Sequence, residues 1–154
     1  MSDQPTFDLA AAHRWFSADC FNRVWGYLEK ADRSDTDNEV MLSLAHVSLA
    51  HWRDREDATD QNFSIGYWLL SRVYAVRENA APALHYGQLC LEYATKESPF
   101  FRAYGHEAIA RAEKVAGNRE AAQAHLEQIR ALLDEVTDSS ERSLLETDLA
   151  DLSS

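Results

Sequence analysis

Apolar residues recur every three or four positions along most of the chain, which is the spacing of an amphipathic α-helix. In the first long segment, residues 8–31, this spacing predicts one buried face made of Ala11, Trp15, Ala18, Phe21, Trp25 and Leu28. The next segment, residues 39–54, has no Lys, Arg, Asp or Glu between Met41 and Trp52. Such a segment predicts a helix that is buried on most sides.

Five further helices are predicted by the same spacing and by residues typical of helix ends. They cover residues 62–77, 82–95, 100–116, 119–136 and 141–152. Pro82 and Pro99 suit the first turn of a helix, and Gly117 suits a helix C-terminus. The 154 residues are the length of one domain, so we expect a single all-α domain over residues 8–154 after a flexible N-terminus at residues 1–7.

Two of the predicted hairpins carry the same pattern at a constant offset, the one that separates Tyr67 from His106. The first copy consists of Tyr67, Leu70, Ser71, Tyr74, Ala83 and Gly87, and the second of His106, Ile109, Ala110, Glu113, Ala122 and Leu126. Ser71 and Ala83, like Ala110 and Ala122, are small where the two helices of a hairpin would approach closely. Self-similarity at such a period predicts stacked helix hairpins.

The pattern resembles the tetratricopeptide repeat (TPR), in which Trp-x2-Leu-Gly-x2-Tyr is followed by Ala-x3-Phe. The resemblance covers about residues 62–136, and the first sixty residues match poorly. The departures are Tyr67 and His106 for the Trp, Glu113 for the second Tyr, and Gly87 and Leu126 for the Phe. A weaker third copy would align Ser43, Val47 and Ala50 with Ala83, Gly87 and Cys90. The resemblance implies a TPR-like stack of antiparallel helix hairpins, with about seven helices in this chain.

The resemblance also implies a concave groove lined by the first helix of each hairpin. The residues that would face this groove are Trp68, Arg72, Tyr104, Glu107 and Arg111. A large aromatic side chain together with arginines is suited to anchoring a peptide. We therefore expect a module that binds a peptide or a partner protein. The alternative for the same residues is structural, with Arg72 paired to Glu107 and Trp68 filling a gap in the core.

A second hypothesis is a small-molecule or enzymatic pocket around His46, His51 and Trp52. His46 lies on an apolar stripe, where a histidine needs a hydrogen-bond partner and has a lowered pKa. The alternative is a core histidine that bonds a neighbouring helix. The six histidines show neither H-x3-H, H-E-x-x-H nor E-x-x-H spacing, and the glycines are isolated. We expect no catalytic residue, no metal and no cofactor.

The net charge limits the classes of partner that we expect. The chain has 15 Lys and Arg against 26 Asp and Glu, which gives a net charge of −11. Such a protein is repelled by nucleic acid and by anionic membranes. The chain has no apolar run long enough to span a membrane and no secretory signal pattern at Met1, and Cys20 and Cys90 are expected to be buried free thiols. These features predict a cytoplasmic protein.

Two features leave alternatives open. The residues from Leu133 onward carry seven acids and one base, so the last helix could meet a basic partner or fold back over Arg72 and Arg111 as an internal plug. The first helix holds more aromatic residues than one stripe needs, namely Trp15, Phe16, Phe21, Trp25 and Tyr27. A third hypothesis is therefore a homodimer or larger homo-oligomer formed through this helix.

Overall fold

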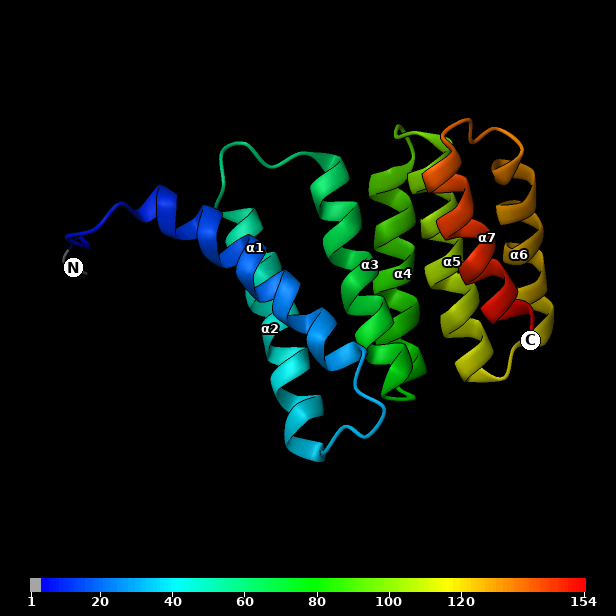
Figure 1. Cartoon of the computed structure of the whole chain (residues 1–154), viewed down its shortest axis with the longest axis horizontal. Helices are drawn as coiled ribbons and strands as arrows, with labels where there is room; N and C mark the ends of the chain where they lie inside the picture. Colours follow the sequence, from blue (N-terminus) through cyan, green and yellow to red (C-terminus); the bar gives the residue numbers. More distant parts are fainter. Residues whose placement is uncertain (1–3) are drawn as a thin grey trace. The chain divides into compact units, whose positions relative to one another are not determined.

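A computed structural model describes residues 4–154, which form seven α-helices and no strand (Figure 1). The helices are α1 (Leu9–Leu28), α2 (Asp35–Arg53), α3 (Asp60–Val76), α4 (Ala80–Ala94), α5 (Pro99–Ala116), α6 (Arg119–Leu133) and α7 (Ser139–Ser153). Helices that follow one another within a unit pack against each other, which confirms the predicted all-α stack of helices. None of these described helices is long and apolar enough to cross a membrane.

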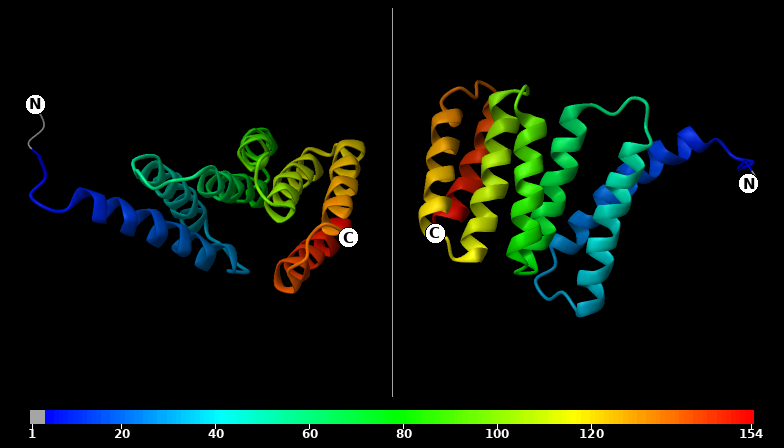
Figure 2. Two further views of the ribbon diagram at one scale, coloured as in Figure 1. Left: turned by 90° about the horizontal axis from the view of Figure 1, so that it is seen from above. Right: turned by 180° about the vertical axis from the view of Figure 1, so that it is seen from behind.

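The contacts divide the chain into two compact units, of which one ends at Thr59 and the other runs Asp60–Ser154. The length had predicted one domain. The first unit is the α1–α2 hairpin, whereas the second packs α3 to α6 one after the next, with α7 against both α5 and α6 (Figure 2). Residues 1–3 of the predicted flexible N-terminus lie outside the described residues, and residues 4–8 precede α1 without helical structure.

Local chemistry explains where the helices begin and end. Ser34 and Asp37 form a capping box, because each side chain accepts a hydrogen bond from the other residue's backbone N–H. This box starts α2 at Asp35, ahead of the predicted start at Glu39. Gly117 ends α5 in the left-handed conformation with φ 81°, as its position predicted.

The second unit repeats at the offset that the sequence predicted. Helices α3 and α5 begin at Asp60 and Pro99, and helices α4 and α6 begin at Ala80 and Arg119, so both pairs share the offset of Tyr67 and His106. Helix α7 begins one residue more than a further offset after α5 and packs against both α5 and α6, so it continues the series as a next first helix.

Small residues lie at the crossing of α3 and α4, as their place in the repeat predicted. Ser71 Oγ donates to the Ala83 carbonyl at 2.8 Å, and both residues are buried. A hydroxyl that reaches the backbone of the next helix requires the two helices to approach closely. The small residues of the pattern therefore fix how tightly this hairpin closes.

The buried face of α1 is not the predicted stripe. Ser17, Cys20 and Val24 are buried, whereas Trp15 is 65% exposed and Trp25 is 37% exposed. The reason is the close crossing with α2, where Ser48 Oγ donates to the Ser17 carbonyl at 2.7 Å. A tryptophan would not fit at such an approach, so small residues occupy the contact.

Helix α2 is also less buried than its composition predicted. Its buried residues are Met41, Leu44, Ala45, Ser48 and Leu49, and Val47 is 41% exposed. Ser43, Val47 and Ala50 are all exposed, whereas Ala83, Gly87 and Cys90 are buried. The burial pattern therefore gives no support to a third copy of the repeat in α2.

Both cysteines are free and buried, as expected. Burial raises the pKa of Cys90 to about 12, and burial together with Asp19 raises the pKa of Cys20. Neither thiol is therefore activated as a nucleophile.

Candidate functional site

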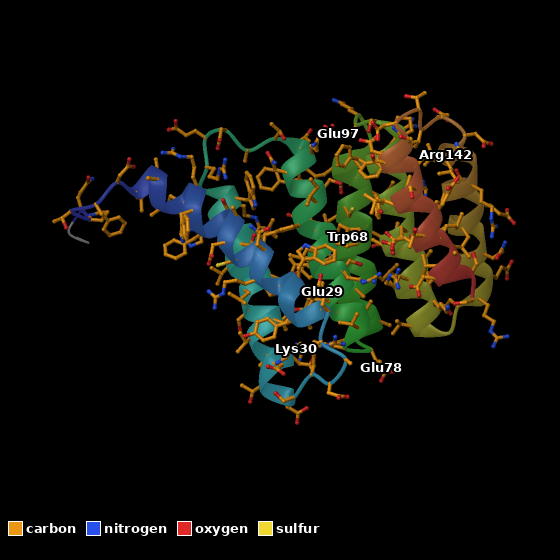
Figure 3. The ribbon with its side chains drawn as sticks, in the orientation of Figure 1. Glu29, Lys30, Trp68, Glu78, Glu97 and Arg142 are labelled. Atoms are coloured by element: carbon orange, nitrogen blue, oxygen red, sulfur yellow. The ribbon has the colours of Figure 1, made fainter. Side chains whose placement is uncertain are left out.

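Four of the predicted groove residues meet around one buried carboxylate, that of Glu107 on α5, which is 1% exposed. Arg111 donates to Glu107 Oε1 from Nε at 2.8 Å and from Nη2 at 2.6 Å. From α3, Trp68 Nε1 donates to Oε2 at 2.7 Å and Arg72 Nη1 donates to Oε1 at 3.4 Å. We call Trp68, Arg72, Glu107 and Arg111 the Glu107 cluster; Figure 3 shows Trp68 in the middle of α3.

The Glu107 cluster joins equivalent positions of the two hairpins, because the repeat offset relates Trp68 to Glu107 and Arg72 to Arg111. The Arg72–Glu107 pair expected as the structural alternative is formed. A carboxylate buried this deeply needs such donors, since an unpaired buried charge is strongly destabilising. The cluster therefore holds α3 and α5 together, whatever else it does.

The two arginines of the cluster differ in environment. Burial lowers the pKa of Arg72, and the like charge of Arg111 lowers it further. Burial also opposes the charge of Arg111, but Glu107 and Asp151 outweigh it and raise the pKa of Arg111. Arg111 is thus the cation that the site stabilises best.

The acidic last helix folds onto this face. Tyr104, the fifth predicted groove residue, donates its hydroxyl to Asp148 Oδ2 at 2.7 Å, and Arg111 Nη1 donates to Asp151 Oδ2 at 3.3 Å. Burial first, and then the bond to Asp148, raises the pKa of the Tyr104 hydroxyl. Leu145 on α7 belongs to the same buried core as residues of α6. The acidic helix therefore contacts Arg111 directly, as the plug alternative supposed.

A cavity of about 760 Å³ opens where α3, α5 and α7 end. It is lined by Ala75, Val76, Glu78, Arg111, Lys114, Val115, Asp151, Leu152 and Ser154. Lys114 Nζ donates to the Leu152 carbonyl at 3.2 Å, and Asp151 is 63% exposed. We call this space the α3–α5–α7 cavity. Its lining combines apolar residues with charges of both signs.

Glu78 is the most unusual residue of the α3–α5–α7 cavity. It lies in the turn from α3 to α4 with φ 56°, a left-handed conformation that favours glycine (Figure 3). The equivalent residue of the second hairpin is Gly117, with φ 81°. The first hairpin therefore keeps a carboxylate where the same turn elsewhere uses glycine. Sequence reasoning missed Glu78, although its alignment with Gly117 was a signal that could have found it.

The three residues of the second predicted pocket all lie on α2 in the first unit. Burial, and then Arg53, lowers the pKa of His46. His51 Nδ1 lies 2.8 Å from His13 Nδ1, and the guanidinium of Arg55 lies 3.9 Å from the ring centre of Trp52. A cavity of about 470 Å³ in this unit is lined by Leu9, Ala10, His13, Arg14, Asp54, Arg55, Glu56 and Asp57. His13 was not predicted, since nothing in the sequence pairs it with His51.

A second histidine pair closes the α5–α6 hairpin, where His106 Nδ1 lies 2.9 Å from His125 Nδ1. Burial, His125 and Arg102 together lower the pKa of His106 to about 4. Within residues 4–154, no group of three or more His, Cys, Asp or Glu side chains is arranged to hold a metal ion.

No family model matches the sequence, and comparison with curated proteins and with solved structures found no match either. A fold class alone does not fix a function, so the function has to be argued from the residues of the site.

Proposed function

We propose that this protein is an interaction module of the TPR-like kind that binds a peptide or partner segment in the α3–α5–α7 cavity. The observation that carries the proposal is Glu78, a carboxylate held in a left-handed turn at this cavity. Such backbone strain is costly and is found preferentially at functional sites. The common offset of α3 to α5 and of α4 to α6 supports the resemblance to TPR stacks.

The residues that line the α3–α5–α7 cavity favour a peptide segment that carries both positive and negative side chains. A carboxylate of the segment is bound by Lys114 and Arg111, and a Lys or Arg of the segment is bound by Glu78. Apolar side chains of the segment contact Val115. Asp151 is the internal competitor, because this exposed carboxylate already pairs with Arg111 at 3.3 Å and an exposed ion pair of this kind is weak.

A set of synthetic peptides tests the proposal. Short peptides of acidic, basic, mixed and neutral charge are titrated into the full chain by isothermal calorimetry, and the mixed-charge peptides are expected to bind most tightly. Glu78→Gly is expected to weaken this binding by about tenfold, the loss of one charged contact of about 1.4 kcal/mol. The same change removes the backbone strain, so the free energy of unfolding stays equal or rises.

Two further variants sharpen the result. Asp151→Asn removes the internal competitor and is expected to tighten binding, whereas Lys114→Ala is expected to weaken it. Trp68→Ala is unsuitable as a binding probe, because Trp68 donates to buried Glu107 and its loss changes stability. The proposal fails if no peptide class binds, or if Glu78→Gly and Lys114→Ala bind the peptides as the unchanged protein does.

A second candidate function is self-association through α1, the third hypothesis from the sequence. The supporting observation is that Trp15 is 65%, Phe16 44% and Leu9 48% exposed. Several large apolar side chains on one surface helix are typical of an interface. Light scattering at increasing protein concentration tests it: a dimer that Trp15→Ala converts to a monomer supports self-association, and a monomer throughout rejects it.

A further inference from the structure

The α1–α2 hairpin holds two imidazoles at a separation that suits a metal ion. Nδ1 of His13 on α1 lies 2.8 Å from Nδ1 of His51 on α2. Two nitrogen ligands at about 2.0–2.1 Å from one ion are roughly 2.9 Å apart at a right angle and roughly 3.3 Å apart at a tetrahedral angle. The separation of the two nitrogens therefore needs little change, but the ring centres lie 5.1 Å apart, so the two Nδ1 atoms point at each other. Each ring has to turn by roughly 45° for both nitrogens to face one ion at a right angle.

The groups nearest to this pair favour a cation. Asp54 Oδ2 lies 3.9 Å from His13 Nδ1, and the Asp54 side chain is 64% exposed, so it has room to turn toward a bound ion. His51 lies in the last turn of α2, where the helix dipole places partial negative charge that attracts a cation. Both contributions stabilise positive charge between the two rings.

Two arginines line the cavity beside the pair and would oppose a cation, but a second carboxylate offsets them. Arg55 is paired with Asp57 through Nε at 2.8 Å and Nη2 at 2.7 Å. Arg14 also acts on this carboxylate, since its charge helps to lower the pKa of Asp57. The charge of Arg55 is therefore paired with that of Asp57.

One face of the His51 ring is covered, and the pair borders an open space. Phe16 stacks on His51 with ring centres 5.2 Å apart and planes 26° apart, which restricts the His51 ring. His13 and Asp54 both line the cavity of about 470 Å³ in this unit. That space has room for the water molecules that would complete the coordination of an ion.

We propose that His13 and His51 bind one divalent transition-metal ion, Cu²⁺, Ni²⁺ or Zn²⁺, through their Nδ1 atoms. Water fills the remaining positions, and Asp54 accepts a hydrogen bond from a bound water. In the metal-free pair one Nδ1–H donates to the other Nδ1. On binding, the donor ring moves this proton to its own Nε2 through solvent, so two neutral rings release no net proton.

The His106–His125 pair is the matched control within the same chain. Its Nδ1 atoms are 2.9 Å apart, so the spacing alone is equivalent. Burial lowers the pKa of His106 to about 4, with His125 and the positive charge of Arg102 adding to it. A dehydrated nitrogen beside a guanidinium is a poor place for a dication, so this pair is expected to bind the ion far more weakly.

Native mass spectrometry and Cu²⁺ electron paramagnetic resonance on the tag-free full chain test the site. We expect one tightly held ion per chain and a spectrum with two nitrogen ligands. His13→Gln and His51→Gln should each abolish this one-to-one binding, and Asp54→Asn should weaken it by about tenfold, as for other groups that orient metal ligands. The double variant His106→Gln/His125→Gln should bind as the unchanged protein does.

Stability supplies an independent readout. Zn²⁺ should raise the melting temperature of the unchanged protein and not that of His13→Gln, because only a folded α1–α2 hairpin presents both ligands. Asp54→Asn keeps both histidines and changes an exposed side chain, so it remains informative if a histidine variant fails to fold. The proposal is overturned if no ion is retained, if the His13 and His51 variants bind normally, or if the His106/His125 variant loses the ion equally.

Discussion

The α1–α2 and α5–α6 hairpins share one contact and differ in almost everything around it. Each is bridged by two histidines with Nδ1 atoms 2.8 Å or 2.9 Å apart. Helix α5 also packs against α3, α4 and α7, whereas in the described part of the first unit α1 and α2 have only each other. The same side-chain pair is therefore half-buried beside Arg102 in one hairpin and borders a cavity in the other.

The difference extends to the apolar residues. Among the described residues, most of the large hydrophobic side chains that are exposed lie in the first unit. They are Phe7, Leu9, Trp15, Phe16, Trp25 and Val47, whereas the second unit exposes Leu144 on α7. In a stack, each added helix packs against helices on two sides, whereas within one hairpin each helix packs against the other helix alone. The first unit thus leaves more of its large apolar side chains exposed, and the second uses its apolar side chains to build a core.

The largest expected effect on the free energy of unfolding is that of Glu107→Ala, which tests the contrast between the two units. The change leaves Arg72 and Arg111 without their shared carboxylate, which we expect to cost about 3 kcal/mol or more of unfolding free energy. Urea denaturation followed by circular dichroism measures it. Asp54→Ala in the first unit is the control and should change stability by less than about 0.5 kcal/mol, because its side chain is 64% exposed. Equal effects of the two changes would contradict the contrast between the units.

Replacing one glycine in each unit by alanine is expected to change stability by a smaller amount, downward in the second unit and upward in the first. A Cβ on Gly105 would lie 2.7 Å from the Leu91 Cα, so Gly105→Ala forces α4 and α5 apart and should cost about 1–3 kcal/mol. A Cβ on Gly26 of α1 would meet nothing within 4 Å, so Gly26→Ala should stabilise by about 0.5–1 kcal/mol. Thermal and urea unfolding of both variants measure the two values. A stabilising Gly105→Ala would show that α4 and α5 do not cross this closely.

The smallest expected effect is the pH dependence from His106. Its pKa of about 4 lies below the ordinary value of 6.5, so the unfolded chain binds the proton first as pH falls. Its contribution to stability is therefore complete above pH 6.5, falls between pH 6.5 and about 4, and is flat below. His106→Gln should flatten this part of the stability profile, measured by urea denaturation from neutral pH down to about 4. A profile unchanged by His106→Gln would mean that the histidine is not buried in the α5–α6 hairpin.

The sequence was a good guide where one local rule decided the structure. Gly117 ended α5, Pro99 stood in its first turn, and Ser71 and Ala83 met at a helix crossing, as expected. The residues expected to face a groove share one face, where four of them form the Glu107 cluster and Tyr104 bonds α7. The Arg72–Glu107 pair among them is the one that the structural alternative expected. Equivalent positions in successive hairpins face equivalent neighbours, which is why the repeat brings Trp68 and Arg72 next to Glu107 and Arg111.

The sequence was a poor guide where an element could turn more than one face inward. The spacing of Trp15, Ala18 and Trp25 predicts a buried stripe, yet Ser17, Cys20 and Val24 are buried instead. Periodicity identifies a helix and its apolar positions, but the partner helix selects which face is covered. Here the close crossing of α1 and α2 requires small residues, and the tryptophans are left more exposed.

By itself, the sequence determined the seven helices, the offset of the repeated hairpins and the set of charged and aromatic residues on their first helices. Those features depend on local propensity and on spacing along one chain. Only the tertiary structure decided that Glu107 is buried, that Glu78 lies at a cavity, and that His13 meets His51. Such contacts join residues far apart in sequence, and their energies depend on burial and on neighbouring charge, which no linear pattern records.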